Sequence, residues 1–248
     1  MSTVAEKYSG SLTSGFNVGG VDFVVDLTSG KNRRPSEINS FTIVKSLPML
    51  NFYFSMAERL KAKRILELGV FQGGSFALID QLFKPEVLVG VEIDKPFEAI
   101  ESYTADQRPD RNVRIYFETS QADEKIIPQI LEGNFADGLD LVIDDASHTY
   151  DLTLQSLELV WPKLEVCGTY IIEDWAWSFT EPMQNPEHPW FDKPGMVNLI
   201  FELVADLGGY GHIRSLSMDR GRVMIVKGAD SPNFLGTKKL RGRGFTHI

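Results

Sequence analysis

Two kinds of apolar periodicity alternate along most of the chain. From Arg64 onward, short apolar runs that suit buried strands are separated by segments with apolar residues every three or four positions, which suit helices. This pattern predicts strands over residues 64–70, 87–94, 113–120, 139–144, 168–174, 212–218 and 222–228. It predicts helices over residues 46–62, 75–83, 96–104, 123–133, 150–164 and 196–209.

Strands that alternate with helices indicate an α/β fold, in which helices cover both faces of a parallel sheet. The last two strands are joined only by the turn-like segment "DRGR", so they should form a hairpin. We therefore expect a doubly wound, seven-stranded, mostly parallel sheet with an antiparallel strand in the C-terminal hairpin. Ligands of such sheets bind beyond the carboxyl ends of the strands, so the polar residues that follow each strand are the candidates for function.

The first 40 residues have weak periodicity and are rich in Ser, Gly, Asn and Thr. We expect an irregular N-terminal arm or cap over residues 1–45, the main domain over residues 46–230, and a tail over residues 231–248. An exposed arm of this kind would also suit a homo-oligomer.

Composition and charge narrow the class of protein. The 248 residues carry a formal net charge of −9, which does not suit a nucleic-acid-binding protein. Cys167 is the only cysteine, so an intrachain disulfide is impossible and a reducing compartment fits. The sequence shows no secretory signal pattern, and no apolar stretch nears the roughly 20 residues of a membrane span. We therefore expect a cytoplasmic protein.

The first predicted strand runs into a glycine-containing turn. Glu67 lies within the strand, and Gly69, Gly73, Gly74 and Ser75 follow it. The glycines allow a tight turn and a close approach of the backbone to a ligand. The spacing is neither the G-x-G-x-x-G dinucleotide fingerprint nor a phosphate-binding P-loop. A carboxylate before the glycines would repel a pyrophosphate and would suit a cationic group.

The next two strand ends are also polar. Glu92 ends the second strand, where a carboxylate can accept both ribose hydroxyls of a nucleoside. Ser120 and Gln121 follow the third strand. The plainer interpretation of this third segment is a polar loop in which Asp123 caps the following helix.

The fourth and fifth strand ends carry the strongest signal. Asp144, Asp145 and His148 follow one strand, and Glu173 and Asp174 end the next. Four clustered carboxylates repel one another unless a cation or protons compensate. A divalent cation is the simplest answer, and oxygen ligands suit Mg²⁺, Mn²⁺ or Ca²⁺. The alternative is that these acids are ordinary turn and capping residues.

The glycine turn "ELGVFQGGS" resembles motif I of the class I S-adenosylmethionine-dependent methyltransferases, which have a Rossmann-like fold. The resemblance implies that Glu67 faces the methionine amino group, that the turn of Gly69, Gly73 and Ser75 binds the cofactor, and that Glu92 binds the ribose. Ser120 and Gln121 match a Ser-Gln pair that lies beside the adenine in the catechol O-methyltransferase branch.

A second resemblance rests on spacing. Asp145 precedes the Glu173–Asp174 pair by 28 residues, the interval between the metal-binding Asp and the Asp-Asn pair of catechol O-methyltransferases. His148 occupies the position of their catalytic lysine. The "DDxSH" and "IED" segments together are similar to the metal-dependent sugar O-methyltransferases, such as the macrocin, mycinamicin and mycobacterial polysaccharide enzymes. The resemblance implies that Asp145, Glu173 and Asp174 bind a divalent metal, expected to be Mg²⁺, and that His148 is the general base. Asp144 would position the cofactor or His148.

The expected reaction fits these residue types. Methyl transfer to a hydroxyl requires that the hydroxyl lose its proton, and a metal and a neutral histidine both favour that loss near pH 7. We expect methyl transfer from S-adenosylmethionine to a sugar hydroxyl of a glycoside, oligosaccharide or polysaccharide precursor. The enzyme alternative is a catechol or another small phenol. A non-catalytic partner that keeps the cofactor fold is the remaining class.

The segment after the fifth strand is long and aromatic. Residues 175–191 contain three of the four tryptophans, Trp175, Trp177 and Trp190. One interpretation is a lid that stacks on a sugar or an aromatic ring of the substrate. The alternative is a cluster that packs the loop down or forms a subunit contact.

Overall fold

The computed structural model describes residues 8–28, 30–105, 111–209 and 211–229. The chain divides into two compact units, residues 1–119 and 120–248. Across the described residues, seven strands form one sheet in the order β10-β11-β9-β8-β5-β6-β7. The predicted α/β class and the mostly parallel sheet with a C-terminal antiparallel hairpin are confirmed.

The first unit combines a short parallel sheet segment with helices. Its strands are β5 (Arg64–Leu68), β6 (Val87–Val91) and β7 (Asn112–Tyr116), and its helices are α1 (Leu47–Arg59), α2 (Gly74–Phe83) and α3 (Glu98–Ala105). The three strands are parallel, with Leu68 paired to Val91 and Val91 to Tyr116. Each lies where the sequence predicted a strand, because a continuous apolar run is what a strand buried on both faces requires.

The N-terminal segment differs from its prediction. The irregular arm expected before residue 45 is instead a sheet of four short strands within the described residues: β1 (Ser9–Ser11), β2 (Gly15–Val18), β3 (Val21–Val25) and β4 (Ser40–Ile43). A 3₁₀ turn, η2 (Gly30–Asn32), lies between the last two strands. The strands are only three to five residues long, and short turns separate β1 from β2 and β2 from β3. Such short strands give too few positions for a clear period of two.

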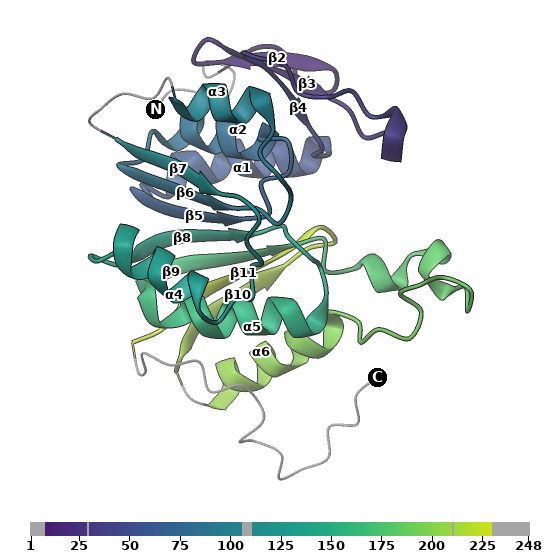
Figure 1. The fold of residues 1–248 in the computed structure, drawn as a ribbon. Coiled ribbons are helices and arrows are strands. Elements are labelled where there is room, and N and C mark those ends of the chain that lie inside the picture. The colour runs from purple at the N-terminus through teal and green to yellow at the C-terminus, as the bar shows by residue number, and fades with distance from the viewer. Residues whose placement is uncertain (1–7, 29, 106–110, 210, 230–248) are drawn as a thin grey trace. The chain divides into compact units, whose positions relative to one another are not determined.

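This small sheet shares its core with the helices of the first unit. Phe16 stacks on Phe23 at 5.2 Å between ring centroids, and Phe23 contacts Phe41. Phe16 also contacts Phe54 of α1, and Phe41 contacts Tyr103 of α3. Figure 1 shows α1, α2 and α3 between the strands β5–β7 and the small sheet. Residues 9–43 are therefore a layer of this unit.

The second unit carries the hairpin and the long loop. Its elements are α4 (Ile126–Asn134), β8 (Leu139–Asp144), α5 (Tyr150–Val160), η3 (Trp161–Lys163), β9 (Leu164–Glu173), η4 (Trp177–Phe179), η5 (Glu181–Gln184), α6 (Val197–Gly209), β10 (Ile213–Met218) and β11 (Arg222–Lys227). β8 and β9 are parallel neighbours, as predicted, and β11 pairs antiparallel with both β9 and β10. The segment with η4 and η5 projects from the strand ends (Figure 1).

The boundaries of the predicted elements need small corrections. The helix expected from residue 96 begins at Glu98, and the strand expected to reach residue 120 ends at Tyr116. In the part of the chain that the structure describes, no helix combines the length and the apolar character needed to cross a bilayer.

Candidate functional site

The turn after β5 requires glycine at two positions. Gly69 and Gly73 have φ values of 85° and 88°, in the left-handed region that side chains disfavour. A Cβ atom on Gly73 would also come within 2.7 Å of the Ile100 side chain. Glu67 is buried at the end of β5, and Ser75 lies in the first turn of α2. The turn therefore carries no side chain at Gly69 and Gly73, where a cofactor could approach the backbone closely.

Glu92 is tied to that same turn. Its Oε2 atom accepts hydrogen bonds from the amides of Val70, at 2.8 Å, and Phe71. Its Oε1 atom accepts the amide of Asp94 at 2.9 Å. The carboxylate thus fixes the turn after β5, a role that the sequence did not indicate. Ribose binding by Glu92 stays a prediction.

Gln121 connects the start of the second unit to the loop after β8. Its Oε1 atom accepts the amide of Ser147 at 2.8 Å, and its Nε2 atom donates to Asp144 at 3.1 Å. Ser120 accepts the amide of Ala122 through Oγ. Asp123 accepts the amides of Lys125 and Ile126 at the start of α4, as the capping interpretation expected. Adenine contacts of Ser120 and Gln121 stay predictions.

Asp144 lies in a buried polar network. Only 2% of its surface is exposed, and its Oδ2 atom accepts hydrogen bonds from Tyr170 Oη at 2.7 Å and Ser156 Oγ at 2.8 Å. Burial raises the pKa of Asp144, while the hydroxyl hydrogen bonds oppose that rise. Burial and the nearby Asp144 carboxyl raise the pKa of Tyr170 well above its ordinary value. The network holds the end of β8 in place.

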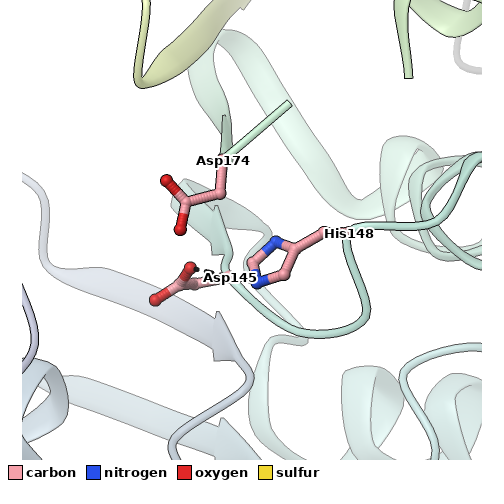
Figure 2. A group of neighbouring side chains, drawn as sticks. All are labelled: Asp145, His148 and Asp174. Carbon is pink, nitrogen blue, oxygen red and sulfur yellow. Dashed lines mark ion pairs between the residues drawn. The ribbon is translucent and has the colours of Figure 1, made fainter. Parts of the chain in front are cut away.

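Three of the predicted residues meet just beyond the ends of β8 and β9. One ligand-type atom from each of Asp145, His148 and Asp174 lies within 4.8 Å of the others. His148 Nε2 is 3.8 Å from Asp145 Oδ1. The side chains of Asp145 and His148 are 21% and 24% exposed, so the cluster is open to a ligand. Figure 2 shows the two carboxylates and the imidazole facing a common region.

Two members of this cluster have unusual backbones. His148 has a φ of 54° and Asp174 a φ of 50°, both in the left-handed region. The Asp174 amide donates to the carbonyl of Gly221 at 2.8 Å, and Trp177 donates its indole N–H to the carbonyl of His148. Such conformations cost free energy and persist where the surrounding structure holds them, often at functional sites.

Glu173 is placed differently from the other predicted metal ligands. It is the last residue of β9, pairs in register with Arg222 and is 1% exposed. Among the described residues, the cluster contains Asp145 and Asp174 together with His148, without Glu173. A ligand role for Glu173 stays a prediction.

The tryptophans of the long loop are partly engaged with the chain itself. Trp175 donates its indole N–H to the carbonyl of Asp219 at 2.7 Å. The rings of Trp177 and Trp190 meet edge to face at 5.0 Å, and Lys193 Nζ lies 5.1 Å from the Trp190 ring centre. Packing within the loop, the alternative interpretation, therefore occurs. Substrate contacts of these tryptophans stay predictions.

Comparison with known proteins identifies the fold. A family model described as a methyltransferase domain matches residues 66–175, from β5 to the residue after Asp174. The fold is that of the Rossmann-like methyltransferases. The family model covers less than half of the chain, so the finding concerns this segment and the fold. No curated protein sequence matches the chain.

Solved structures with the methyltransferase fold are similar to this chain. The MycE methyltransferase of the mycinamycin biosynthetic pathway, in complex with Mg and SAH, is 22% identical over 73% of this chain and 49% of its own, with a TM-score of 0.55. The O-methyltransferase TomG from Streptomyces achromogenes, in complex with SAM, is 18% identical over 75% of this chain and 82% of its own, with a TM-score of 0.54. The chain thus spans about half the length of MycE.

A third neighbour belongs to another substrate group. A Staphylococcus aureus protein described as a caffeoyl-CoA O-methyltransferase is 18% identical over 75% of this chain and 85% of its own, with a TM-score of 0.55. At these identities the likeness concerns the fold of the methyltransferase domain and leaves its acceptor open.

The region that the family model matches contains groups that suit the ligands expected from the sequence. The left-handed glycines after β5 leave no side chain between the backbone and a cofactor. The cluster offers two carboxylates and one imidazole nitrogen, a donor set that suits a divalent cation. Carboxylate oxygens are what Mg²⁺ prefers, while an imidazole adds affinity for Mn²⁺ and other transition metals.

Several residues of this region were not found from the sequence. Ser156 and Tyr170 bind Asp144, and Gly221 holds the backbone of Asp174. Ser156 lies in an expected helix and Tyr170 in an expected strand. The apolar pattern of such an element does not show which single polar side chain points inward. Gly221 is in the expected hairpin turn, and its contact depends on which strand β11 pairs with.

Proposed function

We propose that the protein is an S-adenosylmethionine-dependent O-methyltransferase that uses a divalent cation, most simply Mg²⁺, to methylate a hydroxyl of a sugar. The observation that carries the proposal is the cluster of Asp145, His148 and Asp174 at the ends of β8 and β9. In a methyltransferase fold, this edge of the sheet is where ligands bind.

Each residue of the cluster has a distinct part in the proposed reaction. S-adenosylmethionine supplies an electrophilic methyl group, and the cation makes an acceptor hydroxyl more acidic and orients it. His148 would take the hydroxyl proton at Nε2 as the oxygen bonds to the methyl carbon; the methyl–sulfur bond would break, and S-adenosylhomocysteine would leave. Asp145 and Asp174 would hold the cation, with Glu173 as a third carboxylate at the end of β9. Asp144 and Gln121 keep the loop from Asp145 to His148 in position.

The cofactor would lie over the turn after β5. In this proposal Gly69, Gly73 and Ser75 line its path, Glu67 faces its amino group, and Glu92 reaches the ribose. Gln121 and Ser120 lie beside the adenine. The burial of Glu67 supports this arrangement, because a buried carboxylate would be stabilised by a cationic ligand group.

Two observations bear on the acceptor. MycE, which has been solved with Mg, SAH and mycinamycin VI, has this fold, and the aromatic residues of the 175–191 loop suit the apolar face of a sugar. A catechol or another small phenol is the second candidate, because the caffeoyl-CoA O-methyltransferase neighbour has the same fold. His148 in place of a lysine favours the sugar.

The test is transfer of a labelled methyl group from S-adenosylmethionine to a panel of glycosides and catechols. We expect labelling of a glycoside, loss of transfer when EDTA removes the cation, and recovery with added Mg²⁺. Full activity in EDTA would contradict the metal assignment. Labelling of catechols alone would favour the second candidate, and isothermal titration without heat from S-adenosylmethionine would contradict both.

A matched pair of variants tests the metal ligands directly. Asp145→Asn should weaken Mn²⁺ binding, followed by electron paramagnetic resonance, by at least about tenfold, because a neutral amide replaces a carboxylate ligand. Asp151→Asn on the exposed start of α5 removes the same charge from outside the cluster and should leave Mn²⁺ binding nearly unchanged. Equal effects of the two changes would point to overall charge rather than to a ligand.

A further inference from the structure

The loop after β9 reaches back to the proposed base. Trp177 begins η4, 29 positions after His148, and donates its indole N–H to the carbonyl oxygen of His148. An indole nitrogen is only a donor, so a half-buried Trp gains from such a partner. This hydrogen bond joins the segment expected to meet the acceptor to the residue expected to take its proton.

His148 needs an external restraint. Its φ of 54° is uncommon for a residue with a side chain, and it lies between the end of β8 and the first turn of α5. On one side, the Ser147 amide donates to Gln121 Oε1. On the other, the Thr149 carbonyl accepts the amide of Thr153 within α5. The carbonyl of His148 itself is held by Trp177, so both flanks and the residue are fixed.

Trp177 is in turn placed by its neighbours in the loop. Its ring meets Trp190 edge to face, and the N-terminal end of the loop is pinned where Trp175 donates to Asp219. A molecule that displaces or stacks on the Trp177–Trp190 pair would therefore act on the His148 backbone through one hydrogen bond.

We infer that Trp177 is a positioning residue for His148. Through Trp177, a substrate bound at the loop of residues 175–191 would change the geometry of the proton-accepting imidazole. This inference rests on the proposed function, since it names the residue that holds the proposed base in position. It gives Trp177 a different role from Trp190, whose ring makes no such hydrogen bond to the loop after β8 within the described part of the chain.

The test compares Trp177→Phe with Trp190→Phe in the full chain. Both changes keep an aromatic ring, but only the first removes the donor to His148. We expect Trp177→Phe to lower kcat about tenfold, the scale of one lost hydrogen bond at a catalytic group, with KM for the acceptor within about twofold. Trp190→Phe keeps a ring that can meet Trp177 and removes no bond to His148, so it should lower kcat much less than Trp177→Phe does. Trp177→His, which restores a ring N–H, should recover part of kcat.

A measurement without substrate separates this inference from the proposed function. Amide hydrogen exchange of residues 146–149 should accelerate in Trp177→Phe and stay at the wild-type rate in Trp190→Phe, with equal melting temperatures as a check on folding. Unchanged kcat or unchanged exchange in Trp177→Phe overturns the positioning role. If wild-type protein transfers no methyl group, the proposed function fails, and the exchange rates alone decide whether Trp177 holds the His148 loop.

Discussion

Two adjacent aspartates show how position decides chemistry at the scale of single residues. Asp144 ends β8 and is buried among Gln121, Ser156 and Tyr170, whereas Asp145 is one residue further and partly exposed beside His148. The alternation of side chains along a strand sends neighbours to opposite sides. One carboxylate therefore serves the fold, and the other is exposed enough to reach a ligand.

Replacement of the imidazole tests the proposed base. His148→Ala should lower kcat by about a hundredfold or more, because general base catalysis contributes on that scale. Isothermal titration should give a nearly unchanged affinity for S-adenosylmethionine, since His148 is not among the residues proposed to bind the cofactor. Mn²⁺ binding measured on the same variant separates loss of a base from loss of a metal ligand. A variant with wild-type turnover would remove His148 from the mechanism.

At the scale of elements, the turn between β5 and α2 depends on backbone conformation more than on side chains. Gly73→Ala should destabilise the protein by about 1–3 kcal/mol, because alanine resists a φ of 88° and its Cβ would meet Ile100. It should also weaken S-adenosylmethionine binding. Urea unfolding and isothermal titration measure the two effects.

Gly133 in α4 is the matched control for that change. A Cβ atom there meets nothing within 4 Å, and its helical backbone suits alanine. Gly133→Ala should therefore stabilise the protein by up to about 1 kcal/mol without changing cofactor affinity. If Gly73→Ala proved as harmless as Gly133→Ala, the strained turn would not be needed for folding or binding.

The elements that the sequence predicted well are those with long, consistent periods. The strand predicted over residues 139–144 has the same bounds as β8. The helix predicted over residues 150–164 begins where α5 begins, at Tyr150, and α5 ends earlier, at Val160. Because parallel strands end at one edge, we expected Asp145, Glu173 and Asp174 to bind a metal beside His148. Asp145, His148 and Asp174 do lie together there, without Glu173. The left-handed backbones of His148 and Asp174 could not be predicted, because Gly221 and Trp177 hold them from distant segments.

At the scale of the whole molecule, the N-terminal sheet changes how the chain can be divided. Phe16, Phe23, Phe41 and Ile43 are all buried, and Gly74 at the start of α2 packs closely against the carbonyl of Thr42. The boundary expected near residue 46 would cut through this shared core. As a domain limit this boundary stays a prediction. A protein shortened at this boundary would lose part of the shared core.

Deletion of residues 1–45 should therefore yield protein that is insoluble or melts at a much lower temperature than the full chain. Loss of the buried phenylalanines exposes the apolar surface of α1 and α2, and each large buried side chain contributes roughly 1.5–3 kcal/mol. Thermal unfolding followed by circular dichroism measures the difference. A shortened chain with the full melting temperature would show that the small sheet is an independent appendage.

The hairpin turn after β10 has a consequence for exchange of parts between related enzymes. Gly221 holds Asp174, Asp219 holds Trp175, and Trp177 holds His148, so the first residues of the long loop are fixed to the frame. The chain from residue 178 to residue 195 lies beyond these three attachments. We expect that the length and sequence of this stretch can be exchanged to change which acceptors are admitted. Asp145, His148 and Asp174 should keep their places in such exchanges.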